Sequence, residues 1–133
     1  MEILSQQELQ KMSALALAHI GDAVFELIVR TELCKSGHCM NGNLHRETVA
    51  RVCAQAQAQF VAKILPILSE EEAAFYRRGR NAHVHAIPKN ATHAQYSKAT
   101  GLEALFGMLY LSGRQDRLAE LFAIGMKEED HAL

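Results

Sequence analysis

Apolar residues recur at helical spacing through most of the chain, and short polar or turn-forming segments separate these stretches. Residues 81–93 have no helical period and are expected to form an exposed loop. Gly37 suits a left-handed helix cap, and Pro66 cannot continue a helix. No segment alternates as a strand does, so we expect an all-α fold. The pattern predicts helices over residues 5–12, 14–36, 43–65, 69–80, 94–111 and 114–127.

The chain is 133 residues long, which is enough for one domain with a core of its own. We expect a single domain over residues 1–133 with a flexible tail at about 128–133. The three cysteines have no zinc-ribbon or thioredoxin-like spacing, which is typical of free thiols in a reducing compartment. We expect no secretion signal and no membrane partner, because no apolar run has the required length. The expected location is the cytoplasm.

Charge is distributed unevenly, although the formal net charge is only −1. No acidic residue occurs between Glu72 and Glu103, and several Lys, Arg and His residues lie in that interval. A basic face on an otherwise neutral protein suits binding to a phosphate backbone. The alternative is a solvated segment with a chance excess of bases, and the pattern leaves both interpretations open.

Asp22 stands at the polar edge of the helix predicted over residues 14–36, beside a broad apolar arc. It lies in mid-helix, where it caps nothing and where Asp is a poor helix former. Gly21 before it costs about 1 kcal/mol relative to Ala. That cost is explained if another backbone or a ligand approaches closely at this point.

Glu103 is the one charged residue in GLEALFGMLYL, residues 101–111, a segment that is apolar nearly all round and is therefore predicted to be buried. A buried carboxylate is protonated, ion-paired or bound to a metal. The pattern favours an ion pair and a metal ligand equally. Gly101 and Gly107 indicate close packing of this helix against its neighbours.

Two carboxylates on different apolar helices, with a separate basic segment, suggest a metal-dependent reaction on a polynucleotide. Carboxylate oxygens suit Mg²⁺, which keeps several waters and is held partly by substrate phosphates. Such a metal generates hydroxide, polarises phosphorus and steadies the leaving oxygen. The basic segment would then hold the polynucleotide backbone.

Both acidic residues lie in motifs that resemble those of the ribonuclease III family. HIGDAVFELIV, residues 19–29, is similar to the family's signature helix with its Gly-Asp pair. TGLEALFGMLYLSG, residues 100–113, is similar to the second acidic motif. The resemblance covers about residues 13–113. It implies a helical bundle like the ribonuclease III endonuclease domain, a homodimer, and catalysis by Mg²⁺ that Asp22 and Glu103 bind.

Three departures from the larger members of that family narrow the resemblance. Those members carry a further acid one turn before each motif acid, and here these positions hold Ala18 and Thr100. We also expect no double-stranded-RNA-binding domain after the last helix. With RRGRNAHVHAIPKN, residues 77–90, these features resemble the Mini-ribonuclease III group. That resemblance implies trimming of double-stranded ends of precursor 23S ribosomal RNA, with a ribosomal protein on the substrate as a further candidate partner.

Half of the usual acidic set is missing, so we expect fewer protein ligands, more water around Mg²⁺ and weaker metal binding. RNA contacts would fall to this domain itself, through phosphates and 2′-hydroxyls of the duplex. The alternative function, which Ala18 and Thr100 favour, is a non-catalytic RNA-binding or ribosome-assembly module with the same fold. The candidate RNA-binding residues are Arg77, Arg78, Arg80, Asn81, Lys89, Lys98, His45 and Arg46.

Overall fold

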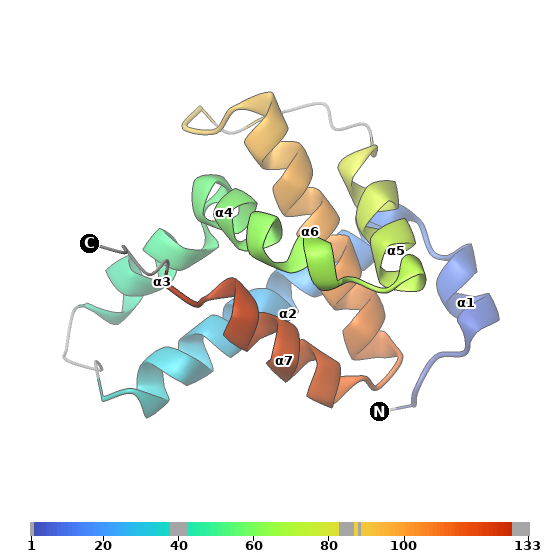
Figure 1. Ribbon diagram of the computed structural model, residues 1–133, viewed down its shortest axis with the longest axis horizontal. Helices are drawn as coiled ribbons and strands as arrows, with labels where there is room; N and C mark the ends of the chain where they lie inside the picture. The colour runs from blue at the N-terminus through green and yellow to red at the C-terminus, as the bar shows by residue number, and fades with distance from the viewer. Residues whose placement is uncertain (1, 38–42, 83–86, 88, 129–133) are drawn as a thin grey trace.

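The computed structural model describes residues 2–37, 43–82, 87 and 89–128, and this part of the chain is helical without a strand (Figure 1). The expected all-α class is confirmed. None of the described helices is long and apolar enough to cross a membrane. The helices are α1 (Gln6–Lys11), α2 (Ala14–Lys35), α3 (Leu44–Val52), α4 (Ala54–Ile64), α5 (Glu70–Arg80), α6 (His93–Leu111) and α7 (Gln115–Gly125), with a 3₁₀ turn, η1, at Leu65–Ile67.

Local sequence signals set several of the helix ends. Ser69 and Glu72 form a capping box at the start of α5, in which each side chain accepts a hydrogen bond from the other residue's backbone N–H. Thr92 and Gln95 form another such box and start α6 at His93, so the loop predicted over residues 81–93 is shorter by one residue. Gly37 follows α2 with a φ of +79°, as its predicted cap role requires. Of the predicted tail at 128–133, residues 129–133 lie outside the described residues.

The single helix predicted over residues 43–65 is wrong. The chain leaves the helical conformation at Cys53, whose φ and ψ of −65° and 157° are extended, and two helices result. Asn43 precedes the first of them but makes no side-chain cap hydrogen bond. The break is a tertiary effect: α3 packs on α2, whereas α4 turns away to pack on α6 and α7. No proline or glycine marks this position in the sequence.

α6 is the central helix, and α2, α4 and α5 pack around it (Figure 1). Its residues 99–109 are buried except for Glu103, which is half-buried. The prediction of a helix enclosed nearly all round is therefore confirmed. A polar side chain within residues 99–109 is therefore surrounded by other parts of the protein and has little contact with bulk water.

Three phenylalanines fix the mutual positions of α2, α4 and α6. Phe25 lies edge-on to Phe60 and Phe106 at ring-centroid distances of 5.2 and 5.4 Å, and Phe60 lies 5.9 Å from Phe106. Edge-to-face contacts of this kind stabilise a pair by roughly 0.5–1.5 kcal/mol beyond the area they bury. One aromatic residue from each helix thus holds the three helices at a common point.

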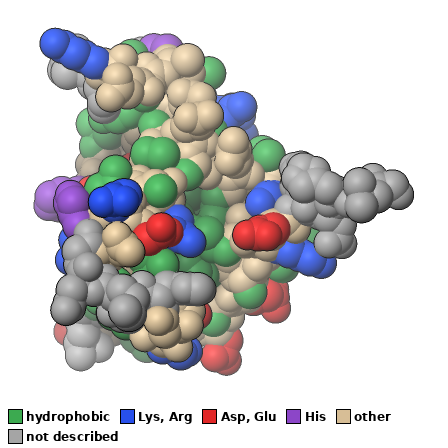
Figure 2. All heavy atoms as spheres, turned by 90° about the vertical axis from the view of Figure 1, so that its left-hand side faces the viewer, with side chains coloured by type: hydrophobic (Ala, Val, Ile, Leu, Met, Phe, Trp, Pro, Cys, Tyr) green, Lys and Arg blue, Asp and Glu red, His purple; other side chains and the backbone are tan. Residues whose placement is uncertain are grey.

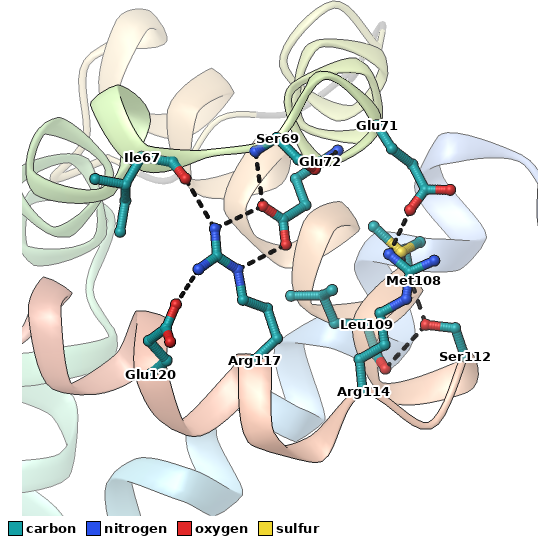
Figure 3. Close-up of polar contacts among 10 residues, drawn as sticks. All are labelled: Ile67, Ser69, Glu71, Glu72, Met108, Leu109, Ser112, Arg114, Arg117 and Glu120. Carbon is teal, nitrogen blue, oxygen red and sulfur yellow. Dashed lines mark hydrogen bonds and ion pairs between the residues drawn. The ribbon is translucent and has the colours of Figure 1, made fainter.

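Ion pairs connect α7 to the beginning of α5 (Figure 3). The Arg117 guanidinium donates to both carboxylate oxygens of Glu72 at 2.8 and 2.9 Å and to the Ile67 carbonyl at 2.8 Å. Burial opposes ionisation of Glu72, but hydrogen bonds from Arg117 and Ser69 hold the pKa of that carboxyl below its ordinary value. Arg114 pairs with Glu71 beside it. These acids are therefore neutralised within the fold.

Candidate active site

The two motif helices cross with their backbones in contact. A Cβ atom added to Gly21 of α2 would overlap the carbonyl oxygen of Glu103 and lie 2.5 Å from its carbonyl carbon. A Cβ atom added to Gly107 of α6 would likewise overlap the Leu17 carbonyl oxygen. Only glycine permits this approach at either position. The close packing predicted from Gly21 and Gly107 is confirmed.

The crossing brings the two motif acids together. Asp22 follows Gly21 on the exposed side of α2, and its carboxyl acts on the Glu103 carboxyl across the crossing. Burial, together with the neighbouring Asp22 carboxyl, raises the pKa of Glu103 to about 9. Without a cation, therefore, Glu103 retains its proton at neutral pH. This explains how a carboxyl group is tolerated in an otherwise apolar helix.

The pair lies between two hollows in the surface. Glu103 lines one of about 410 Å³, together with Gln57, Asn90 and Tyr96. Asp22 lines the other, of about 510 Å³, whose wall includes Tyr110. The carboxyl groups are thus reachable from outside on both sides of the crossing.

The donors at the crossing fit a magnesium ion that keeps most of its water. Among the described residues, no group of three or more His, Cys, Asp or Glu side chains is placed to hold a metal. The two positions that carry acids in larger family members contribute none: Ala18 is buried, and the Thr100 hydroxyl donates to the Tyr96 carbonyl at 3.0 Å. Two carboxyl groups remain, and their negative charges would repel each other if both were ionised without a cation. A divalent cation with a mostly aqueous shell suits that donor set.

Gln57 is a site residue that the sequence analysis did not single out. It is only 2% exposed, and its side chain interacts with the Glu103 carboxyl. The segment AQAQAQ, residues 54–59, indicates helix and little else. The sequence does contain one sign of this role. Gln57 stands three residues before Phe60, on the apolar face of α4, and an amide buried there needs a hydrogen-bond partner.

Most of the predicted RNA-binding residues lie where α5 ends and α6 begins. Arg77, Arg80, Asn81 and Lys98 are exposed, and none of the three basic ones forms an ion pair with another described residue. Lys89, in the segment that connects the two helices, is exposed as well. Close packing of α5 on α6 brings these side chains into one region. At the other end of α5, Glu71 and Glu72 pair with Arg114 and Arg117, so these two acids do not offset the positive charge here.

Arg78 is placed differently from its neighbours. One guanidinium nitrogen donates to the Met12 carbonyl at 2.6 Å, and the group lies over the Phe75 ring, 5.2 Å from its centroid. Its other terminal nitrogen is buried without a partner among the described residues. Arg78 therefore connects α5 to the segment between α1 and α2, which is a role in the fold.

His45 and Arg46 lie apart from this region, because they are exposed on α3, which packs on α2 and α4. The face in Figure 2 carries Lys and Arg side chains separated by acidic and apolar ones. The basic residues on that face are therefore separated from one another and do not form one continuous patch. His83 and His85 lie outside the described residues.

Comparison with known proteins agrees with the motifs. A model described as "Ribonuclease III domain" matches residues 15–114, a range that contains Asp22 and Glu103. A Mini-ribonuclease 3 of Symbiobacterium thermophilum is 45% identical over 107 residues, which are 80% of this chain and 82% of that protein. A Mini-ribonuclease 3 of Thermoanaerobacter sp. is 41% identical over 126 residues, or 95% and 89% of the two chains. A crystal structure of a Fusobacterium nucleatum protein superposes with a TM-score of 0.80 at 30% identity, covering 88% of this chain and 93% of that one.

Proposed function

Because the chain belongs to the ribonuclease III family and is an endoribonuclease, we propose that it cuts double-stranded RNA with Mg²⁺ held by Asp22 and Glu103. Its helical bundle is the endonuclease fold of that family. The observation that carries the proposal is the meeting of the two motif carboxyls where α2 and α6 cross. The oxygen chemistry of the two carboxyls, the partial burial of Glu103 and the hollow beside each acid all suit a metal that acts on a phosphodiester.

The two carboxyls have different parts in the proposed site. Asp22 is exposed and faces the incoming substrate, whereas Glu103 is half-buried and fixed by the packing of α6. Mg²⁺, when bound, would supply a water-derived nucleophile and offset the negative charge that develops on the phosphate oxygens and on the leaving oxygen. The fold supplies the spacing: the contact of Gly21 with the backbone of α6 sets how far apart the two carboxyls stand.

The exposed residues at the α5–α6 junction would hold the RNA backbone. Guanidinium, ammonium and amide groups suit phosphates and 2′-hydroxyls, which are the groups that a duplex presents across its minor groove. His45 and Arg46 on α3 would supply a second, separate point of contact. Arg78 is left out of this surface because its guanidinium is engaged inside the fold.

A second copy of the chain would complete the enzyme. Leu27 of α2 is 64% exposed, and it lines both the hollow beside Asp22 and an adjoining groove of about 730 Å³ between α2 and α7. That groove is walled by Leu118, Phe122 and Met126. We expect a second copy of the chain to cover this apolar surface. A symmetric dimer through it would place two sites on one duplex, one for each strand.

The proposed substrate is the double-stranded end of precursor 23S ribosomal RNA, in the cytoplasm, with a ribosomal protein on the RNA as a candidate partner. The support for this finer assignment is the resemblance to the Mini-ribonuclease III group. Phosphate and shape contacts alone do not select one duplex among many. Selection of this one substrate would therefore come from the RNA's own fold and its bound protein.

The test is cleavage of a perfect RNA duplex and of precursor 23S RNA by wild type, Asp22→Asn and Glu103→Gln, in Mg²⁺ and in chelator. We expect cleavage by the wild type only, and only with Mg²⁺. The control variant is Glu26→Gln, which removes a half-buried acid one turn from Asp22 that pairs with Arg30 at 2.9 Å. Cleavage at the wild-type rate by either site variant, or in chelator, would overturn the metal mechanism.

The same experiment decides the second candidate, a non-catalytic RNA-binding module. The observation in its favour is the absence of acids at Ala18 and Thr100, with the Thr100 hydroxyl used inside its own helix. If the wild type cleaves neither RNA but binds both with salt-sensitive affinity, the module is the better account.

A further inference from the structure

Three polar residues occupy equivalent positions on three different helices. Asp22, Gln57 and Glu103 each stand three positions before one of the mutually packed phenylalanines, Phe25, Phe60 and Phe106. Residues three apart lie on the same face of a helix. The aromatic cluster therefore sets the three polar side chains together one turn away. Asp22 and Gln57 both reach Glu103 from their own helices.

Gln57 is the uncharged member of this group, and it is the most deeply buried. Its side chain is enclosed on α4 among residues of the core, and it borders the same hollow as Glu103. Burying an amide without a hydrogen bond costs about 1–3 kcal/mol in proteins. A buried amide at this position therefore needs a polar partner. The Glu103 carboxyl borders the same hollow, and the amide lowers its pKa.

We propose that Gln57 is a positioning residue of this endonuclease, whose side-chain amide donates to the Glu103 carboxylate and holds it facing Asp22. The proposal rests on the function proposed above. An N–H donor engages one lone pair of a carboxylate, favours its ionised form and limits its rotation. The remaining lone pairs of Glu103 are then directed to the space beside Asp22.

This role fits the reduced acidic set. With Ala18 and Thr100 in place of acids, Glu103 lacks a second carboxylate beside it on α6 to share a metal. A neutral amide orients the carboxylate that is left and adds no further negative charge to a partly buried site. Gln57 thereby helps to orient Glu103 through a hydrogen bond, at a site where two of the family's acids are absent.

The test compares Gln57→Met, which keeps the length and removes the amide, with Gln59→Met as the matched control. Gln59 is exposed on the same helix two residues on. For Gln57→Met we expect kcat on an RNA duplex to fall about 10- to 100-fold, with KM for RNA unchanged and with more Mg²⁺ needed for half-maximal rate. Gln59→Met should match the wild type in all three. Wild-type kcat and Mg²⁺ requirement in Gln57→Met would overturn the proposal.

A measurement on the wild type avoids dependence on the folding of the Met variant. The side-chain amide protons of Gln57, followed by nuclear magnetic resonance, should shift when Mg²⁺ is added to wild type but not when it is added to Glu103→Gln. An amide signal that does not respond to Mg²⁺ in the wild type would overturn the proposal, whatever the Met variant does.

Glu103→Gln in the same assay separates this proposal from the function beneath it. Suppose that the wild type cleaves RNA, that Glu103→Gln does not, and that Gln57→Met cleaves at the wild-type rate. The positioning role of Gln57 is then excluded, and the proposed function stands. If wild type cleaves no RNA in Mg²⁺, the proposed function fails, and the positioning role fails with it.

Discussion

Gly21 of α2 lies directly against the backbone carbonyl of Glu103 in α6, with no room between them for a methyl group. Gly21 directly precedes Asp22, the first motif acid, and the residue that it contacts, Glu103, is the second motif acid. Helix packing and the chemistry of the site therefore depend on the same pair of residues. A change that separates the helices also separates the carboxyls.

Gly21→Ala should both destabilise the protein and abolish cleavage. The added methyl group meets backbone, which cannot move aside as a side chain can, so we expect a loss of about 3 kcal/mol or more in the free energy of unfolding. Urea unfolding measures it. Ala62→Gly, on the exposed side of α4, is the control and should cost only about 1 kcal/mol of helix propensity. Wild-type stability in Gly21→Ala would contradict the observed crossing.

The metal-free protein should lose stability as pH rises from the ordinary carboxyl pKa of 4.5 toward about 9. Burial and Asp22 raise the pKa of Glu103 to about 9, so the folded state holds a proton that the unfolded state has already released. Stability falls wherever the folded state binds more protons, and the contribution is fully present only below 4.5. Urea unfolding in chelator, at mildly acidic and alkaline pH, should show this slope in wild type and a smaller one in Glu103→Gln. An equal dependence of stability on pH in wild type and in Glu103→Gln would show that Glu103 is not the group with the raised pKa.

The sequence predicts those features that depend on neighbours in the chain. The helix starts predicted at residues 5 and 69, the cap at Gly37 and the enclosure of Glu103 follow from local or periodic signals, and the structure confirms them. Capping boxes at Ser5 and Ser69 fix the two helix starts. The need for a close approach at Gly21 also followed from the cost of glycine in mid-helix. The identity of the approaching group, Glu103, did not.

Features that depend on which helices pack together were not predicted. The extended residue Cys53 interrupts a sequence rich in helix formers because α3 and α4 pack on different partners. Arg78 reads as one more base in RRGR, yet its guanidinium reaches the carbonyl of Met12, 66 residues away in the chain. Gln57 likewise gains its role from a helix far along the sequence. Such relationships arise only in three dimensions.

Arg78 and Arg80 should respond in opposite ways to replacement by alanine. Arg80→Ala, alone or with Arg77→Ala, should weaken RNA binding and lower the salt slope by about one for each lost phosphate contact, with stability unchanged. Arg78→Ala should instead reduce stability by roughly 1–3 kcal/mol, since it removes a charged hydrogen bond, and should leave the salt slope unchanged. Filter binding over a salt series, with urea unfolding, measures both. A reduced salt slope in Arg78→Ala would return it to the RNA surface.

Leu27→Glu should convert a dimer into monomers. The substitution puts a charge at an apolar side chain that is 64% exposed in the single chain, where only burial by a partner would make it costly. Analytical ultracentrifugation should find wild type as a dimer and the variant as a monomer with unchanged helix content. Ile3→Glu, at a comparably exposed apolar residue that precedes α1 and lines neither the hollow beside Asp22 nor the groove between α2 and α7, is the control. A wild-type monomer, or an unaffected Leu27→Glu dimer, would rule out this interface.

Calorimetric titration of the protein with Mg²⁺ shows whether Asp22 and Glu103 together hold one magnesium ion. We predict weak binding to wild type that strengthens with pH up to about 9, because Mg²⁺ must displace the Glu103 proton. The binding should be lost in Asp22→Asn and in Glu103→Gln and kept in Glu26→Gln. Binding that persists unchanged in either site variant would show that Mg²⁺ binds elsewhere and would rule out the proposed site.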